Sequence, residues 1–150
     1  EFGSNVLDKG NNIDREKLGG IVFSDIRQLK KLNSITHPTI INEINNRIDK
    51  IKLNCRDKTK IVIDAPLLLE TKAKDLVDKI IVVACNKENI IRRNKKFSKG
   101  RIEKILKSQF PLNKKLEHAD FIIDNNKGMK YLEKQVKIII EKLNQSYKKL

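Results

Sequence analysis

Residues 79–84, with the sequence KIIVVA, form a short apolar run rich in β-branched side chains. Two similar runs are residues 60–64 (KIVID) and residues 120–124 (DFIID). Apolar runs of this length are typical of strands that are buried on both faces of a parallel sheet. Residues 65–78 separate the first two runs and leave enough chain for the crossover that parallel strands require. The three runs therefore predict a narrow parallel sheet.

Helical spacing of apolar residues fills the stretch before the first predicted strand. Asp14 is expected to cap a helix with apolar positions over residues 18–32, and Gly19-Gly20 predicts close packing or a break within it. Pro38 is expected to begin a second helix, because proline suits the first turn. The apolar stripe of this second helix runs over residues 40–51.

More helices are predicted after the second strand. They begin near Lys87, cross residues 102–106, begin again at Pro111, and cover residues 129–147, where an apolar stripe is expected to pack in the core. Helices that alternate with short apolar strands predict an α/β fold with a parallel sheet.

Length and composition narrow the class of protein. The chain has 150 residues, 39% of them hydrophobic and 35% charged, which fits a single folded domain over residues 1–150. It contains no apolar run long enough to span a membrane. Residues 1–5 (EFGSN) do not resemble a secretory signal, and Cys55 and Cys85 are too far apart for a zinc motif. We therefore expect a cytoplasmic protein without disulfides.

The positive charge is concentrated. Residues 86–115 contain eleven basic and two acidic residues, a net +9 of the total formal charge of +14. The high Lys, Asn and Ile content is also what an AT-rich coding sequence would produce. The window predicts either a site for a polyanion or a solvated basic face.

Polar residues follow the predicted strands. They are Asp64, Cys85-Asn86 and residues 124–126 (DNN). Ligands of open α/β sheets bind beyond the carboxyl ends of the strands. We therefore expect a binding crevice at this edge.

A series of short motifs runs along nearly the whole chain. Its members, in order, are Phe2-Gly3, residues 13–15 (IDR), Leu18-Gly19, Val22-Phe23, His37-Pro38, residues 64–70 (DAPLLLE), Arg93, Ser98, Gln109, Lys115, Ala119-Asp120, residues 123–125 (IDN) and Gly128. No member is specific alone, but the ordered set with its PLLxE element is. The set resembles the dephospho-coenzyme A kinase family.

The resemblance implies a P-loop nucleoside-kinase-like three-layer fold. It also implies transfer of the γ-phosphoryl group of ATP to the ribose 3′-hydroxyl of dephospho-CoA, with Mg²⁺, in the last step of coenzyme A synthesis. Four regions are implied: a helical substrate-binding region at 14–56, core strands and crossover at 60–85, a basic lid region at 86–118, and the last strand with the C-terminal helix at 119–150.

The resemblance also implies residue roles. Arg93 matches the first lid arginine, and the second is replaced by Lys95 or Lys96, which act as point charges in poorer geometry. Asn125, Asn126, Lys127 and Gly128 form the turn that is expected beside the adenine, and Asn125 and Gly128 are the residues assigned to ATP. Each has a plainer interpretation, as a surface cation or an ordinary turn residue. Arg92 and Arg101 are weaker candidates, and Ile105 stands where the family often has an arginine.

The acceptor side is implied by two motifs. His37 is expected to contact dephospho-CoA or to orient the turn at Pro38, rather than to act as an acid or base. Residues Pro66, Leu67, Leu68 and Glu70 are expected to shape the acceptor pocket, although a leucine pair is as easily core. Asp64 is expected either to hold Mg²⁺ through water or to serve as a turn residue.

Two family elements do not occur in the 150 residues. The chain contains no GxxxxGK[S/T] loop, which would cradle the phosphates, and no Asp-Ala-Asp element with the general base. We expect a strand and P-loop, roughly 30 residues or more, to have been lost before Glu1. We therefore expect the 150 residues alone not to phosphorylate a substrate.

The alternative function is a nucleic-acid-binding module that uses the 86–115 window. Aromatic residues make up 5% of the chain and tryptophan is absent, so stacking platforms for single strands are scarce. We expect ATP and dephospho-CoA as partners, no membrane, no nucleic acid, and a monomer or weak oligomer.

Overall fold

The computed structural model describes residues 1–55 and 59–146, and it divides into two compact units. The first unit contains Glu1–Leu76 and Lys107–Gln109. The second contains Val77–Leu106 and the chain from Phe110 onward. The predicted region boundaries at residues 56 and 150, and Tyr147 at the end of the C-terminal stripe, lie outside the described residues.

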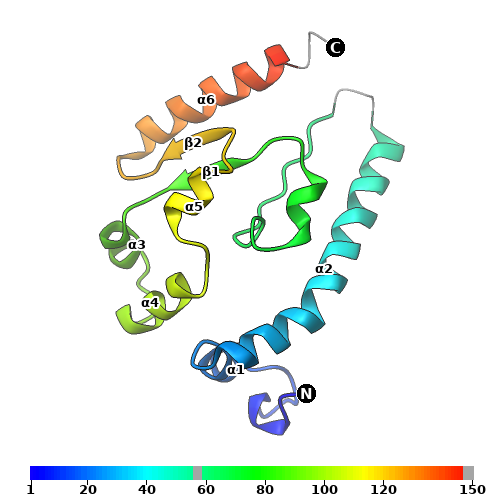
Figure 1. Ribbon diagram of the computed structural model, residues 1–150, viewed down its shortest axis with the longest axis vertical. Helices are drawn as coiled ribbons and strands as arrows, with labels where there is room; N and C mark the ends of the chain where they lie inside the picture. Colours follow the sequence, from blue (N-terminus) through cyan, green and yellow to red (C-terminus); the bar gives the residue numbers. More distant parts are fainter. Residues whose placement is uncertain (56–58, 147–150) are drawn as a thin grey trace. The chain divides into compact units, whose positions relative to one another are not determined.

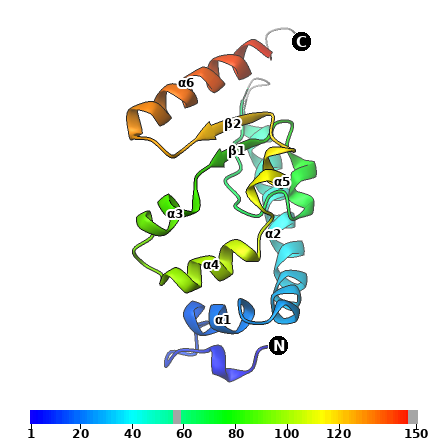
Figure 2. The ribbon, with the colours of Figure 1, turned by 60° about the vertical axis from the view of Figure 1, so that its left-hand side comes forward.

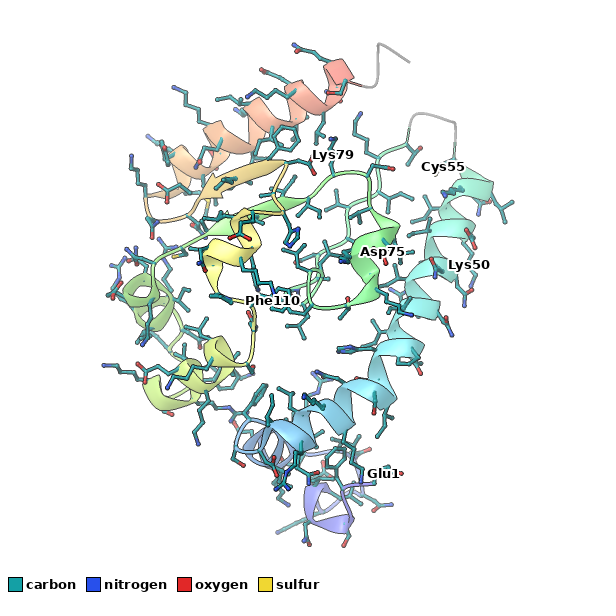
Figure 3. All side chains as sticks on the ribbon, viewed as in Figure 1. Glu1, Lys50, Cys55, Asp75, Lys79 and Phe110 are labelled. Carbon is teal, nitrogen blue, oxygen red and sulfur yellow. The ribbon has the colours of Figure 1, made fainter. Side chains whose placement is uncertain are left out.

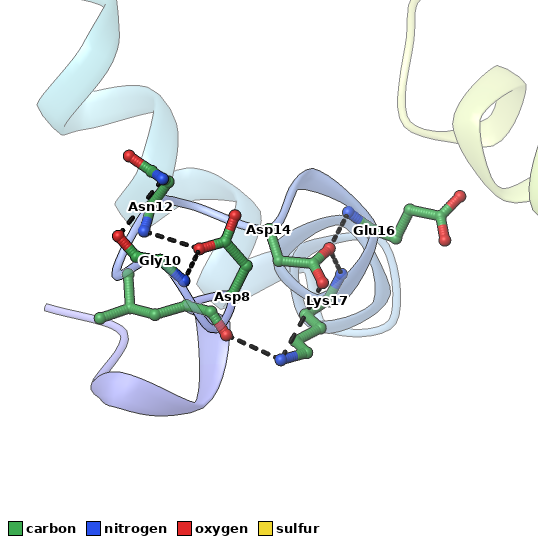
Figure 4. A network of polar contacts seen from close by, with 7 residues as sticks. Asp8, Gly10, Asn12, Asp14, Glu16 and Lys17 are labelled. Carbon is green, nitrogen blue, oxygen red and sulfur yellow. Dashed lines mark hydrogen bonds and ion pairs between the residues drawn. The ribbon is translucent and has the colours of Figure 1, made fainter.

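The first unit begins with a hydrogen-bonded loop. A short helix, η1 (Ser4–Val6), is followed by an antiparallel bridge between Leu7 and Ile13. Asp8 Oδ1 closes the loop by accepting from the backbone N–H of Gly10 at 2.8 Å and of Asn12 at 2.9 Å (Figure 4). These contacts complete a tight turn.

Helix α1 (Arg15–Val22) begins where the sequence predicts. The Asp14 side chain accepts from the backbone N–H groups of Glu16 and Lys17, which confirms the predicted cap. The helix continues through Gly19-Gly20, so the predicted break is not there. Gly19 is buried, in keeping with the close packing that was the other expectation.

Helix α2 (Ile26–Asn54) contains Pro38 in its interior, so the prediction that Pro38 begins a helix is wrong. The helix begins instead after Asp25, whose carboxylate accepts from Arg27 N–H at 2.8 Å. Pro38 has no N–H to donate, which usually bends a helix, and α2 bends along its length in Figure 1. The predicted apolar stripe also begins later, because Ile40 is 52% exposed.

Residues 60–64 form no strand, which corrects the prediction of a third strand. A strand needs a partner for its backbone groups, and among the described residues this run has no ladder partner. Tight turns follow: Leu68 N–H donates to Ala65 O at 3.1 Å and Glu70 N–H to Leu67 O at 3.2 Å. A short helix, η2 (Lys72–Leu76), completes this part of the unit.

The second unit contains the parallel sheet that the sequence predicts, with two strands among the described residues. Strand β1 (Ile81–Ala84) pairs with β2 (Phe121–Asp124), and Val82 lies opposite Ile122. Helix α6 (Met129–Ser146) packs against β2, and helix α5 (Leu112–Leu116) packs against β1 (Figure 2). Val82 and Ile123 are buried between these elements.

The amino ends of the strands are joined by an ion pair. Lys79 Nζ (labelled in Figure 3) lies 2.8 Å from Asp120 Oδ1, and Ile80 N–H donates to Asp120 Oδ2 at 2.8 Å. The hydrogen bonds from Lys79, and then from the Ile80 N–H, hold the pKa of Asp120 below its ordinary value of 3.8. These contacts fix the start of both strands.

The predicted helices of this unit are confirmed as α3 (Lys87–Arg93), α4 (Lys99–Lys107), α5 and α6 (Met129–Ser146). Only part of the α6 stripe is core: Ile139 is buried, whereas Met129 is 67% exposed. None of the described helices is long and apolar enough to cross a lipid bilayer.

Candidate functional site

The candidate site lies where the two parallel strands end. The ladder extends one residue beyond β2, because Asn125 N–H donates to Ala84 O at 2.8 Å. The turns 85–86 and 125–128 therefore lie beside each other, although 40 residues separate them along the chain. This is the edge at which the sequence predicts a crevice.

Helix α3 leaves the first of these turns. Asn86 begins the helix, since its side chain accepts from Asn89 N–H at 2.9 Å. The N-cap satisfies one of the free amides of the first turn. Arg93 is the last residue of this short helix. Helix α3 therefore begins after the capping residue Asn86 at the strand-end edge and ends at Arg93.

Arg93 is held by the second turn. Its Nη1 donates to the backbone oxygen of Asn125 at 2.7 Å and to Asn125 Oδ1 at 3.1 Å, and its Nη2 donates to Lys127 O at 3.4 Å. An arginine has five N–H donors in a planar fork. The Nε–H and the second Nη2 N–H have no acceptor among the described residues. The guanidinium is therefore anchored on one side and keeps donors for a ligand.

A cavity of about 410 Å³ opens beside this guanidinium. We call it the strand-end pocket, and its lining residues are Cys85, Ile90, Arg93, Asn94, Lys95, Lys96 and Asn125. Four of the five residues that the sequence assigns to ATP line it: Arg93, Lys95, Lys96 and Asn125. Three are cations, and all carry hydrogen-bond donors, as an anionic ligand requires.

Gly128, the fifth residue assigned to ATP, immediately precedes helix α6 and does not line the pocket. Its carbonyl accepts from Tyr131 N–H at 3.1 Å and from Leu132 N–H at 3.3 Å. A Cβ atom at this position would meet no heavy atom within 4 Å. The structure therefore gives no steric reason for glycine here.

The residues that the sequence assigns to the acceptor belong to the first unit. His37 is half-buried in the middle of α2, and Pro66 is exposed. Leu67, Leu68 and Glu70 are half-buried in the tight turns before η2. His37 precedes a proline inside a helix, so the predicted role of orienting a turn at Pro38 is wrong.

Asp64 is an exposed carboxylate just before these turns. Among the described residues, no three His, Cys, Asp or Glu side chains gather as a metal site would require. Protein sites for Mg²⁺ usually supply only one or two carboxylates, with substrate phosphates completing the shell. The predicted contact between Asp64 and Mg²⁺ therefore stays a prediction.

Sequence reasoning placed Cys85 and Asn126 at this edge without a specific role, and it missed Ile90 and Asn94. Cys85, Ile90 and Asn94 line the strand-end pocket, and Asn126 joins the two turns by hydrogen bonds. The signal that points to Cys85 and Asn126 is their place after the strands. Ile90 and Asn94 carry no such signal, because a position on α3 becomes a pocket wall only once the helix has docked.

Comparisons with known proteins agree with one another. The family model for dephospho-CoA kinase matches residues 1–131. The chain is 38% identical to the dephospho-CoA kinase of Carboxydothermus hydrogenoformans, covering 94% of this chain and 69% of that protein. It is 39% identical to the Aquifex aeolicus enzyme of the same name, covering 95% and 71%.

Solved structures give the same fold. The chain is similar to the dephospho-CoA kinase from Campylobacter jejuni with a TM-score of 0.58 and 30% identity, covering 93% of this chain and 70% of that one. It is also similar to TT1252 from Thermus thermophilus, with a TM-score of 0.68 and 23% identity, covering 95% and 73%. At that identity, the second likeness shows the fold alone.

Proposed function

The chain belongs to the dephospho-CoA kinase family, and we propose that its strand-end pocket binds the phosphates of ATP. The proposed reaction is transfer of the γ-phosphoryl group of ATP to the ribose 3′-hydroxyl of dephospho-CoA. The observation that carries the pocket assignment is the anchored guanidinium of Arg93 beside Lys95 and Lys96. Phosphoryl transfer depends mainly on positioning and on neutralising the charge of the transferred group.

Arg93 is the proposed positioning cation. Asn125 and Lys127 hold one side of its guanidinium with carbonyl oxygens, so little side-chain entropy is lost when the remaining N–H groups meet phosphate oxygens. Lys95 and Lys96 are exposed on the loop after α3 and would add charge without fixed geometry. Asn125 offers an amide at the pocket wall, and we keep Gly128 as a backbone neighbour of the nucleotide.

On the acceptor side, we propose that His37, Pro66, Leu67, Leu68 and Glu70 form the dephospho-CoA surface of the first unit. All of these side chains except the exposed Pro66 are half-buried, and the tight turns at 65–71 give residues 66–70 a defined backbone. Asp64 is the proposed contact for Mg²⁺, which would neutralise phosphate charge. We keep the proposed regions 14–56, 60–85, 86–118 and 119–150, and a monomer or weak oligomer.

The alternative of nucleic-acid binding through residues 86–115 is not supported by the comparisons. The 150 residues contain no GxxxxGK[S/T] motif, so we expect them, tested as they are, to bind ATP without turnover. Turnover of dephospho-CoA in a coupled assay would contradict this expectation.

The test of the pocket is ATP binding by Arg93→Ala. A charge-assisted hydrogen bond contributes ~1.5–3 kcal/mol, so we expect ATP affinity to fall ~10–100-fold. The dissociation constant is measured by NMR titration with ATP, which also detects weak binding.

The matched control is Arg47→Ala, which removes an arginine that is paired with Glu43 on the exposed face of α2. It should bind ATP as the unmodified chain does. Equal affinities for the two variants would show that Arg93 is an ordinary surface residue.

A further inference from the structure

We propose that Asn126 is a positioning residue for ATP, which acts through Arg93 without touching the nucleotide. This inference rests on the proposed role of Arg93. Asn126 is exposed and lies outside the lining of the strand-end pocket. Its importance comes from what its side chain joins.

The carboxamide of Asn126 bonds to three residues in two segments. Its Oδ1 accepts from the backbone N–H of Asn86 at 2.8 Å and from Asn89 Nδ2 at 3.2 Å. Its Nδ2 donates to Asp124 Oδ1 at 2.7 Å. Both halves of the amide are therefore used, one toward the start of α3 and one toward the end of β2.

The same turn holds Arg93. The carbonyls of Asn125 and Lys127, the two neighbours of Asn126, both accept from the guanidinium. Asn126 ties this turn to Asn86, the N-cap residue of α3, and Arg93 is the last residue of α3. The side chain of Asn126 therefore fixes the cation and its carbonyl anchors relative to each other.

Few side chains can replace this amide. Aspartate retains the acceptor for Asn86 but puts a second carboxylate against Asp124, where Nδ2 now donates. Alanine removes both halves and leaves Asn86 N–H without this acceptor. The need for a donor and an acceptor on one short side chain distinguishes this position from an ordinary turn asparagine.

The first experiment compares Asn126→Ala with Asn144→Ala, an exposed asparagine on the same unit. We expect ATP to bind ~10-fold more weakly to Asn126→Ala and equally well to the control. The NMR signal of Arg93 Nε–Hε, identified by its loss in Arg93→Ala, should shift or broaden only in Asn126→Ala. Unchanged affinity and an unchanged signal in a folded variant would overturn the proposal.

A swapped pair makes the test independent of simple destabilisation. Asn126→Asp should weaken ATP binding, because two carboxylates then face each other. Adding Asp124→Asn restores one amide and one carboxylate with exchanged places, and it restores the original net charge. We expect the double variant to return within ~3-fold of the unmodified affinity, a coupling that independent sites would not show. If the double variant instead loses as much ATP affinity as the two single variants together, the positioning role is wrong. This holds even where one single variant folds poorly.

The two proposals fail in different ways. If Arg93→Ala leaves ATP affinity unchanged, the proposed pocket is wrong, and the role of Asn126 falls with it. If Arg93→Ala weakens binding while the folded Asn126 variants and the swap do not, the pocket stands and only the positioning role is wrong.

Discussion

Residues 61–63 (IVI) and 81–83 (IVV) have nearly the same composition, yet only the second run is a strand. Val62 is 88% exposed, whereas Val82 is 8% exposed and lies opposite Ile122. The difference is the partner: β1 finds β2, and the first run has no ladder among the described residues. A β-branched run can form a strand, but it does so only where a second segment pairs with its backbone.

The same difference separates the residues proposed for phosphate from the residue proposed for Mg²⁺. Because β1 and β2 end together, the residues that follow them meet and hold Arg93. Asp64 follows the unpaired run and has no second strand end beside it in the described sheet. Paired strands therefore bring the residues after them together, and this comparison can be tested by substitution.

The largest expected effect is on the paired run's core. Ile123→Ala removes a side chain that is 7% exposed between the sheet and its helices, and we expect it to lower the free energy of unfolding by ~2–5 kcal/mol. Val62→Ala should change it by less than ~0.5 kcal/mol. Urea denaturation followed by circular dichroism measures both. Similar losses for the two variants would show that the 61–63 run is packed as β1 is.

A smaller effect is expected at the outer side of β2. Gln135 Oε1 accepts from Asp124 N–H at 2.9 Å, and Gln135 Nε2 donates to Asp124 O at 3.0 Å. Gln135→Ala should lower the free energy of unfolding by ~1–2 kcal/mol, because two backbone groups lose their partners. Gln145→Ala, at an exposed position of α6, is the control for lost helix contacts. A loss equal to that of the control would mean that water replaces the Gln135 amide.

The smallest effect concerns the amino ends of the strands. The pKa of Asp120 is lowered in the folded chain, so its contribution to stability is present above its ordinary value of 3.8 and is lost as pH falls through the lowered pKa. The ion pair with Lys79 is partly exposed, so we expect only ~0.2–1 kcal/mol. Urea denaturation midpoints are measured for Asp120→Asn and for the unmodified chain at neutral and at acidic pH. The two midpoints should differ at neutral pH and become equal at acidic pH. A constant difference at all pH values would assign the effect to packing.

The sequence predicted part of this architecture for physical reasons that can be stated. The runs at 81–84 and 121–124 were predicted because their pattern suits a buried parallel pair. Arg93, Lys95, Lys96 and Asn125 were assigned to ATP by the resemblance to the family, and the structure places all four around one pocket. Pro38 misled the prediction because its preference for a first turn is local.

The positioning role of Asn126 could not be assigned from the sequence, which places this residue at the strand-end edge and no further. Its partner is a backbone N–H 40 residues away, and a backbone group carries no sequence signal. Likewise, the 60–64 run has the right composition, and only the absence of a ladder in the described sheet shows that it is not a strand. Both cases depend on contacts between segments that are distant along the chain.

The Gln135 side chain also limits the pairing of a further strand with the outer edge of β2. Backbone groups alternate between the two edges of a strand, and those of Asp124 face away from β1 because the neighbouring Asn125 N–H bonds to Ala84 O. Of the four residues of β2, only Ile122 and Asp124 direct their backbone N–H and C=O groups toward the outer edge. The Gln135 amide already bonds both backbone groups of Asp124. A strand of another molecule would therefore find few free backbone groups at this edge. The Gln135 side chain of α6 thus protects β2 against edge-to-edge aggregation.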